Sequence, residues 1–357
     1  MMTNETSALI KKLTEEHSLS LEEYEHLILN RDADAQKLLA ENAVTERKKI
    51  YGTDVFIRGL IEFTNFCKNN CFYCGIRAGN SKCVRYRLSE EEILSCTDEG
   101  RALGYRTFVL QSGEDPYFTD ERLCSIVQKI KARHPDCAIT LSIGERTKES
   151  YRRLFEAGAE RYLLRHETAS EEHYRKLHPE KMSLKNRMQC LYDLRETGFA
   201  VGAGFMVGSP FQTAENLAND LMFIETFKPE MCGIGPFIPH KETPFKDYPA
   251  GSVDLACYLL SIIRLIHPPV LLPATTALAT LSNDGREKGL KSGANVIMPN
   301  LSPVKVRGKY TLYDGKVCTG EESAQCRNCI TKRVEATGYQ IVTGRGDFAG
   351  DAWDADK

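Results

Sequence analysis

The chain has 357 residues, of which 42% are hydrophobic and 27% are charged. This length and composition fit a globular protein with one large domain or two ordinary ones. The formal net charge is -2, with 47 basic against 49 acidic residues, so no basic excess indicates nucleic acid or an anionic membrane as a partner.

The first fifty residues form a predicted helical extension. Apolar residues recur at three- and four-residue intervals in LEEYEHLILN and DADAQKLLAENAVTERKKIYG, as on the buried face of a helix. No apolar signal sequence is present at the N-terminus. The most apolar stretch, ACYLLSIIRLI, is too short to span a bilayer and carries Arg264. We therefore expect a cytoplasmic protein.

Three closely spaced cysteines follow the first predicted strand, VFIRGLIEF. Cys67, Cys71 and Cys74 have the spacing C-x3-C-x2-C, and Cys83 lies outside it. Thiolates are soft ligands that suit iron–sulfur clusters and zinc. Three ligands on a cubane cluster leave one iron open for a small molecule, as the open position does in catalytic zinc sites. A zinc site, or a fourth ligand from elsewhere in the chain, is the alternative.

Eight short apolar runs alternate with amphipathic ones from Val55 onward. After VFIRGLIEF come RTFVLQS, AITLSIG, RYLLRHE, AVGAGFMVG, MCGIGPFIP, VLLPATT and NVIMPNL. Helix-like runs such as SEEEILSCTDEGRALG and TKESYRRLFEAG separate several of them. This alternation predicts an α/β fold, a parallel (β/α)8 barrel of the TIM type, with an open doubly wound sheet as the alternative. The three cysteines would then lie at the C-terminal mouth of the barrel, where barrel enzymes carry out their chemistry.

Alternation along the strands places polar side chains inside this barrel. Residues two apart on a strand share a face, and the sharing pairs are Arg58 with Glu62, Thr140 with Ser142, and Arg165 with Glu167. The same rule lets only one of Thr275 and Thr276 line the lumen. Buried charge is costly unless it is paired or meets a ligand. The arginines therefore indicate either a structural Arg–Glu network or a chamber that binds an anion.

A second cysteine group lies near the C-terminus. Cys318, Cys326 and Cys329 have the spacing C-x7-C-x2-C. A second iron–sulfur cluster on the surface is the favoured interpretation, and zinc is the alternative, although a structural zinc prefers four ligands. The final stretch, GRGDFAGDAWDADK, is polar and Gly-rich, which is typical of a frayed tail. The predicted segments are a helical extension over 1–50, the barrel over 51–310, an auxiliary iron–sulfur segment over 311–340 and a flexible tail over 341–357.

Longer strings indicate a family. RYRLSEEEI, LQSGEDPY, RYLLRHETA, GAGFMVGSP, GIGPFIPH, LPATTALAT and SGANVIMPN, together with both cysteine motifs, resemble the radical S-adenosylmethionine (SAM) maturases of diiron (FeFe) hydrogenase, the HydE type. The resemblance runs from about Tyr51 to Gly338. It implies an enzyme in which a 4Fe–4S cluster binds SAM and cleaves it reductively to a 5′-deoxyadenosyl radical. It also implies a small anionic substrate, a cysteine-bound iron carbonyl cyanide complex.

The resemblance also assigns individual positions. It gives Cys67, Cys71 and Cys74 to the 4Fe–4S cluster, and it places Tyr73 beside the adenine of SAM and Arg187 at its carboxylate. The other implied SAM contacts are Gly113, Glu114, Ser142 and Glu167. The implied substrate positions are Arg58, Gln111, Arg165, Thr275, Thr276, Met298 and Tyr310. Cys318, Cys326 and Cys329 would hold a second cluster, 2Fe–2S or 4Fe–4S, which not all relatives keep.

The implied partners are a reductase or ferredoxin that donates electrons, and the other hydrogenase maturases. Three rival functions remain open. A methylornithine-synthase-like mutase shares the GEDPY string. A biotin-synthase-like sulfur inserter would need cluster ligands inside the barrel, for which Cys232 is the main candidate. A non-enzymatic electron carrier or cluster scaffold is disfavoured by the open iron position and the polar lumen.

Overall fold

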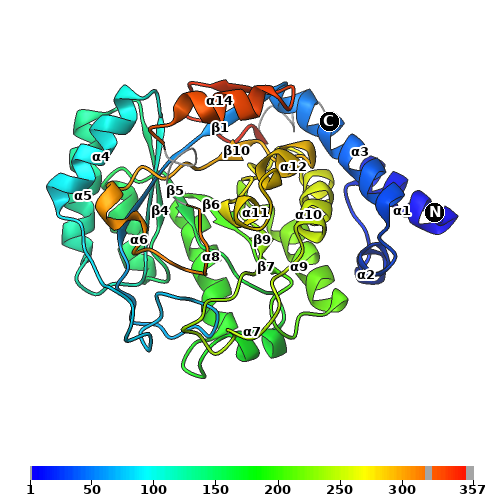
Figure 1. The fold of residues 1–357 in the computed structure, drawn as a ribbon, viewed down its shortest axis with the longest axis horizontal. Coiled ribbons are helices and arrows are strands. Elements are labelled where there is room, and N and C mark those ends of the chain that lie inside the picture. The colour runs from blue at the N-terminus through cyan, green and yellow to red at the C-terminus, as the bar shows by residue number, and fades with distance from the viewer. Residues whose placement is uncertain (1, 318–323, 351–357) are drawn as a thin grey trace.

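The computed structural model describes residues 2–317 and 324–350 (Figure 1). Three helices come first, α1 (Asn4–Glu16), α2 (Leu21–Leu29) and α3 (Ala33–Tyr51). Ser20 and Glu23 form a capping box at the start of α2, which satisfies two backbone N–H groups there. Helices α2 and α3 pack on the outside of the barrel, against α9 (Ala214–Phe227) and α10 (Val253–Ile266) respectively.

Parallel strands form the centre of the molecule. The first strand consists of β1 (Asp54–Ile57) and β2 (Gly59–Thr64), with Arg58 between them. From β2 the sheet continues in chain order through β3 (Thr107–Ser112), β4 (Ala138–Ser142), β5 (Arg161–Leu163), β6 (Ala200–Ala203) and β8 (Met231–Cys232). Single bridges then connect Met231 to Leu271 and Pro273 to Val296, and β10 (Val296–Ile297) pairs with β1. The sheet therefore closes on itself, which confirms the predicted barrel rather than the open sheet.

Helices surround the barrel. They are α4 (Glu90–Ala102), α5 (Asp120–Arg133), α6 (Lys148–Glu156), α7 (Glu171–Leu177), α8 (Leu184–Thr197), α9, α10, α11 (Thr276–Leu281) and α12 (Gly285–Lys291). The outward strand residues Ile139 and Leu141 are fully buried beneath them, as alternation predicted. Two short strands, β7 (Met206–Val207) and β9 (Gly235–Pro236), extend the wall at the mouth. Among the described residues, no helix is both long and apolar enough to cross a membrane.

The C-terminal segment reaches the opposite end of the barrel. After α13 (Val304–Arg307) and α14 (Arg327–Glu335), β11 (Gln340–Val342) pairs in parallel with the start of β1. Residues 343–350 then lie against the floor of the barrel, where Arg161 donates a hydrogen bond of 2.7 Å to Asp347 and Thr107 donates one of 2.7 Å to the carbonyl of Arg345. Residues 341–350 of the expected flexible tail thus have defined barrel contacts, whereas 351–357 lie outside the described residues.

Candidate active site at the mouth of the barrel

A cavity of about 330 Å³ lies at the C-terminal ends of the strands. It is the place where the expected cluster and SAM residues meet. Its lining includes Cys67, Cys71 and Cys74, together with Tyr73, Gly113, Glu114, Ser142, Glu167 and Arg187. Residues that are separated by up to 120 positions in the sequence therefore face one space, because the strands that carry them run in parallel and end at the same level.

The loop that carries the three cysteines is held by buried hydrogen bonds. The Asn65 side chain donates to the carbonyls of Val84 (2.9 Å) and Lys309 (2.7 Å). Arg85 donates to the carbonyls of Ile76 (2.8 Å) and Arg77 (2.7 Å), so its charge serves the backbone of the loop. These contacts fix the cysteine loop before any ligand binds.

Gly75 brings the cysteine loop against the segment that follows α13. Its N–H donates to the carbonyl of Leu312 at 2.7 Å. A Cβ atom at this position would lie 2.2 Å from the carbonyl oxygen of Thr311 and 2.4 Å from a ring carbon of His240. Glycine is thus required here by close backbone approach, directly after Cys74.

The three cysteines are free thiols. Burial raises the pKa of Cys67, raises that of Cys71 to about 12 and raises that of Cys74 strongly. Buried thiols bind as thiolates only where a cation replaces water as the stabilising partner. No three His, Cys, Asp or Glu side chains in residues 2–317 and 324–350 converge closely enough for a single metal ion. Three free, half-buried thiols on one cavity fit an iron–sulfur cluster, whose irons would supply the missing positive charge.

Two ion pairs at the edge of the cavity keep unused hydrogen-bonding capacity. Arg165 Nη2 lies 3.1 Å from Glu167 Oε2, and Arg187 Nε lies 2.6 Å from Glu145 Oε1. Neither contact has the alignment of a hydrogen bond, and all four atoms are buried without another partner. Burial opposes the charge of Arg187, but Glu145 and its other neighbours outweigh burial and raise its pKa. These groups therefore keep hydrogen-bonding capacity that a charged ligand can use.

Glu167 has a left-handed backbone conformation, with φ of +69°. Its N–H donates to the carbonyl of Gly204 at 3.0 Å, and it forms an isolated parallel bridge with Phe205. This conformation turns the chain shortly after β5. The Glu167 side chain lines the cavity, as alternation from Arg165 predicted.

Five of the seven implied substrate positions line the same cavity, namely Gln111, Arg165, Thr275, Thr276 and Tyr310. The expectation that only one of the two threonines faces inward is wrong. Thr275 is the N-cap of α11 and Thr276 begins that helix, so the period of two does not apply to them.

Arg58 and Met298 lie deeper, in a narrower internal space that Thr140 and Leu163 also line. Leu163 borders both spaces. Arg58 donates to the sulfur of Met231 at 3.0 Å and to the carbonyl of Gly346 at 3.4 Å, so it faces the floor of the barrel. Burial, and then the charge of Arg161, lower its pKa. The two arginines that were expected to form one anion site thus line different spaces.

Two polar residues in this region were not singled out from the sequence. Glu145 directly follows the strand-like run AITLSIG, so its place at the mouth of the barrel was a usable signal. Lys316 forms a buried ion pair with Glu62 and donates a hydrogen bond of 3.0 Å to the carbonyl of Tyr310. No local pattern connects residues 254 positions apart.

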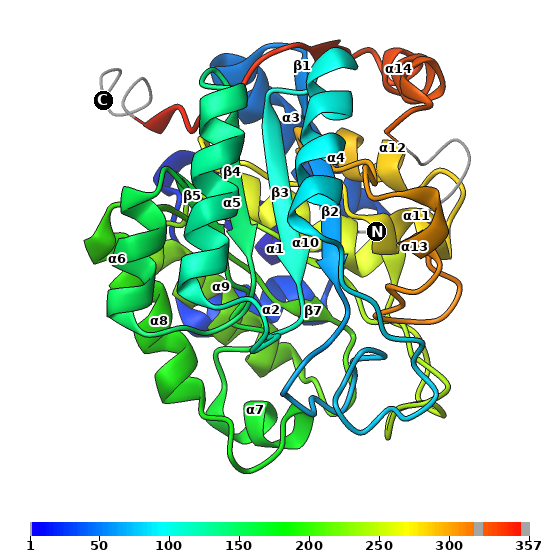
Figure 2. The same cartoon turned by 90° about the vertical axis from the view of Figure 1, so that its left-hand side faces the viewer.

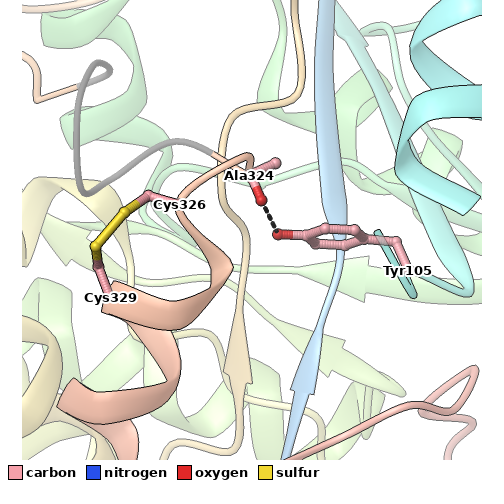
Figure 3. Close-up of a disulfide and its surroundings, with 4 residues drawn as sticks. All are labelled: Tyr105, Ala324, Cys326 and Cys329. Carbon is pink, nitrogen blue, oxygen red and sulfur yellow. Dashed lines mark hydrogen bonds between the residues drawn. A yellow bond between two sulfur atoms is a disulfide. The ribbon is translucent and has the colours of Figure 1, made fainter. Parts of the chain in front are cut away.

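Cys326 and Cys329 of the second cysteine group lie far from this cavity (Figure 2). Cys326 is the N-cap of α14, and its sulfur is bonded to that of Cys329 (Figure 3). Tyr105 anchors Ala324, two residues before Cys326, by a hydrogen bond of 3.2 Å to the Ala324 carbonyl. In Figure 2 the cysteine loop lies at the lower end, toward which the strands point, and α14 lies at the upper end. Cys318 falls outside the described residues, so the three-cysteine cluster stays a prediction.

Comparisons with known proteins agree with this geometry. The model of the radical SAM superfamily matches residues 61–224. The FeFe hydrogenase maturase subunit HydE of Thermotoga maritima is 45% identical over 82% of this chain and 83% of its own length. The 3-methylornithine synthase of Methanosarcina acetivorans is 28% identical over 95% of both chains.

Solved structures give the same picture of the fold. The crystal structure of methylornithine synthase, PylB, has a TM-score of 0.83 at 25% identity and covers 97% of this chain and 99% of its own. A structure of HydG, a maturase of FeFe hydrogenase, has a TM-score of 0.80 at 20% identity, over 95% of this chain and 76% of its own. The latter likeness supports the barrel fold alone.

Proposed function

The chain belongs to the radical SAM superfamily and, within it, to the HydE-type hydrogenase maturases. On this basis we propose a role for each group of residues that lines its cavity. Cys67, Cys71 and Cys74 hold a 4Fe–4S cluster with one iron open to SAM. When bound, this cluster supplies the electron that cleaves SAM to a 5′-deoxyadenosyl radical. The observation that carries the proposal is the single cavity onto which the three free cysteines and all six expected SAM positions open.

The chain itself binds and orients SAM. SAM carries an amino group and a carboxylate, and the cavity offers carboxylates at Glu114 and Glu167 and a guanidinium at Arg187. Arg187 turns from Glu145 toward the SAM carboxylate, because its Nε has no aligned acceptor in the structure. Charge-assisted hydrogen bonds of this kind are short and directional, so they fix the position of the sulfonium.

The remaining polar wall binds the substrate. Arg165, Gln111, Thr275, Thr276 and Tyr310 face the cavity, and Arg165 carries a permanent charge in a planar fork of donors. Such a wall suits a small anion, and we propose a cysteine-bound iron carbonyl cyanide complex, supplied by another hydrogenase maturase. The apolar residues Leu163, Phe237 and Ile238 share the lining and exclude water from the reacting atoms.

The mutase and the sulfur inserter are less well supported. The maturase relative is 45% identical, against 28% for the methylornithine synthase. A sulfur inserter with a second cluster inside the barrel needs further cysteines there. Among the described residues, the cavity lining includes no cysteine beyond the three of the loop, and Cys232 is buried elsewhere. We assign the second cluster instead to Cys318, Cys326 and Cys329, outside the barrel, with the Cys326–Cys329 disulfide first reduced to two thiolates.

Release of 5′-deoxyadenosine tests the proposal. The reconstituted protein is reduced with dithionite in the presence of SAM, and the product is quantified for the parent, Cys71→Ala and Cys83→Ala. Cys83 is the matched control, since it lies in the same segment but does not line the cavity. We expect Cys83→Ala to behave as the parent and Cys71→Ala to release no product. Release at the parent rate by Cys71→Ala contradicts the cluster assignment.

A further inference from the structure

Three ion pairs around the cysteine loop share one polarity. Each buries its carboxylate and exposes its cation. The exposed side-chain fractions are 56% for Lys68 against 8% for Glu114, 74% for Lys82 against 24% for Glu242, and 35% for Arg87 against 1% for Asp115. On helix α3, Lys49 and Glu46 have the same polarity, at 60% and 6%, whereas Lys37 and Glu41 are exposed by 77% and 60%. The pairs around the loop therefore present positive charge to solvent although each is internally neutral.

The sequence of the loop has the same sign of charge. Residues 65–87 contain five basic side chains, Lys68, Arg77, Lys82, Arg85 and Arg87, and no Asp or Glu. The apolar side chain of Val84 lies among them and is 64% exposed. We call the surface formed by Lys68, Lys82, Val84 and Arg87 the cluster face. It combines outward positive charge with an apolar contact, which are two features of protein docking sites.

The cluster face belongs to the same loop as the cluster ligands. Phe66 and Lys68 flank Cys67 in the chain, and the Arg87 guanidinium lies 3.8 Å from the centre of the Phe66 ring. Asn65 connects to Val84 by its hydrogen bond to the carbonyl. On the other side of the loop is the cavity, which SAM and the substrate occupy in the proposed function. The outer side is thus the remaining short route for an electron.

We propose that the cluster face docks a small acidic one-electron carrier protein of the ferredoxin class. The inference rests on the proposed function, which requires one electron per SAM cleaved. The reduced carrier loses that electron to the cluster bound at Cys67, Cys71 and Cys74 and leaves oxidised, and no group is transferred. Positive charge on the enzyme and negative charge on the carrier steer the encounter and set its orientation.

The test reverses charge on the cluster face without touching the cavity. The variant is Lys82→Glu with Val84→Asp, and neither residue lines the cavity. Lys68 and Arg87 are left in place, because their removal would strip a cation from the largely buried carboxylates Glu114 and Asp115. The matched control is Lys37→Glu with Leu29→Asp, which makes the same change of charge at positions of similar exposure on the N-terminal helices.

Binding is measured first, apart from turnover. An oxidised acidic ferredoxin is titrated by calorimetry into the reconstituted parent, the variant and the control, at low and high ionic strength. We expect the variant to bind about tenfold or more weakly than the parent at low salt. The control should match the parent, and salt should weaken parent binding because exposed charges are screened. Equal affinity for parent and variant, or no measurable binding to the parent, overturns the docking face.

Two reductants then separate this inference from the proposed function. With reduced ferredoxin, the variant should release 5′-deoxyadenosine more slowly than the parent and the control. With dithionite, which needs no docking face, all three should be equal. A loss confined to ferredoxin supports the inference, and equal rates with ferredoxin overturn it. Failure of the parent with dithionite instead contradicts the proposed function, whatever the ferredoxin affinity.

Discussion

Glu167 carries backbone strain at the place where the proposed chemistry occurs. It is one of four non-glycine residues with positive φ in the described chain. His17 and Lys228 are helix C-caps, where this conformation is common. Glu167 caps no helix, and its carboxylate lines the cavity. Strain of about 1–3 kcal/mol persists where surrounding structure enforces it, often at functional sites.

Arg165 is the residue on which the substrate proposal depends most. Replacement by Met should leave the cluster assembled but reduce activation of the diiron hydrogenase about ten- to hundredfold, because a charge-assisted contact is worth about 1.5–3 kcal/mol. Arg165→Lys is the matched control, since it keeps the charge and loses the fork. Hydrogenase activity after maturation in a mixture with the other maturases is the measurement. A Met variant as active as the parent would favour a structural Arg165–Glu167 pair.

The cysteine loop is positioned by its neighbours rather than by its own secondary structure. Gly75 packs against residues 311–312 so closely that a methyl group does not fit. We expect Gly75→Ala to push the loop away, to lower the iron content after reconstitution and to destabilise the fold by about 1–3 kcal/mol, the usual range for overpacking. Gly308→Ala is the control, because a Cβ there meets nothing within 4 Å. Full iron loading of Gly75→Ala would show that the loop tolerates the displacement.

Helix α10 ends on a histidine that the fold keeps neutral. Burial, and then the charge of Arg264, lower the pKa of His267 to about 3. In the unfolded chain a histidine titrates near 6.5, so between these values only the unfolded chain binds the proton. The free energy of unfolding therefore falls as the pH falls below 6.5, by up to about 1.4 kcal/mol per pH unit for this residue.

Urea unfolding of the cluster-free chain at pH 7.5, 6.5 and 5.5 measures this effect. His267→Leu should lose stability less steeply than the parent between pH 6.5 and 5.5. Both the parent and the variant still lose stability in acid, because burial also lowers the pKa of His166 and His178 to about 3. Parallel pH profiles for parent and variant would contradict a neutral His267 in the folded chain.

Sequence periodicity predicted the strands and their inward side chains well. Gln111 and Ser142 face the cavity from the ends of β3 and β4, where the period of two holds, and Arg165 and Glu167 face it from just beyond β5. The rule failed at Thr275 and Thr276, where the chain has already left the strand. Alternation along a strand also predicts which way a side chain points but not how deep in the barrel it lies. It therefore could not show that Arg58 and Arg165 line different spaces.

The whole molecule has a closed floor that the sequence did not reveal. Residues 343–350 are polar and Gly-rich, as in a free tail, but Asp347 finds the buried Arg161, and the carbonyl of Gly346 accepts from Arg58. Both partners lie more than 180 positions earlier in the chain. The composition of a segment shows how polar it is, but it does not show which distant buried groups still need a hydrogen-bond partner.

The cysteine loop and helix α14, which carries Cys326 and Cys329, lie at opposite ends of the barrel (Figures 1 and 2). From this separation we expect the Ala variant of Cys318, Cys326 and Cys329 to lose iron and visible absorbance but to keep 5′-deoxyadenosine release with dithionite. Iron content and product are measured on the same reconstituted sample. Unchanged iron content would contradict a second cluster. Loss of product with the first cluster intact would make the second cluster part of the electron route.

The central claim is that Cys67, Cys71 and Cys74 hold one cluster with an iron open to SAM, inside the cavity that they line. Electron paramagnetic resonance of the reduced protein tests it most directly, with Cys318, Cys326 and Cys329 replaced by Ala so that one cluster is observed. We predict the signal of a singly reduced 4Fe–4S cluster that changes shape when SAM is added, and that is absent when Cys71 is also replaced by Ala. A signal that keeps its shape when SAM is added, or that is unchanged when Cys71 is replaced by Ala, would contradict the account.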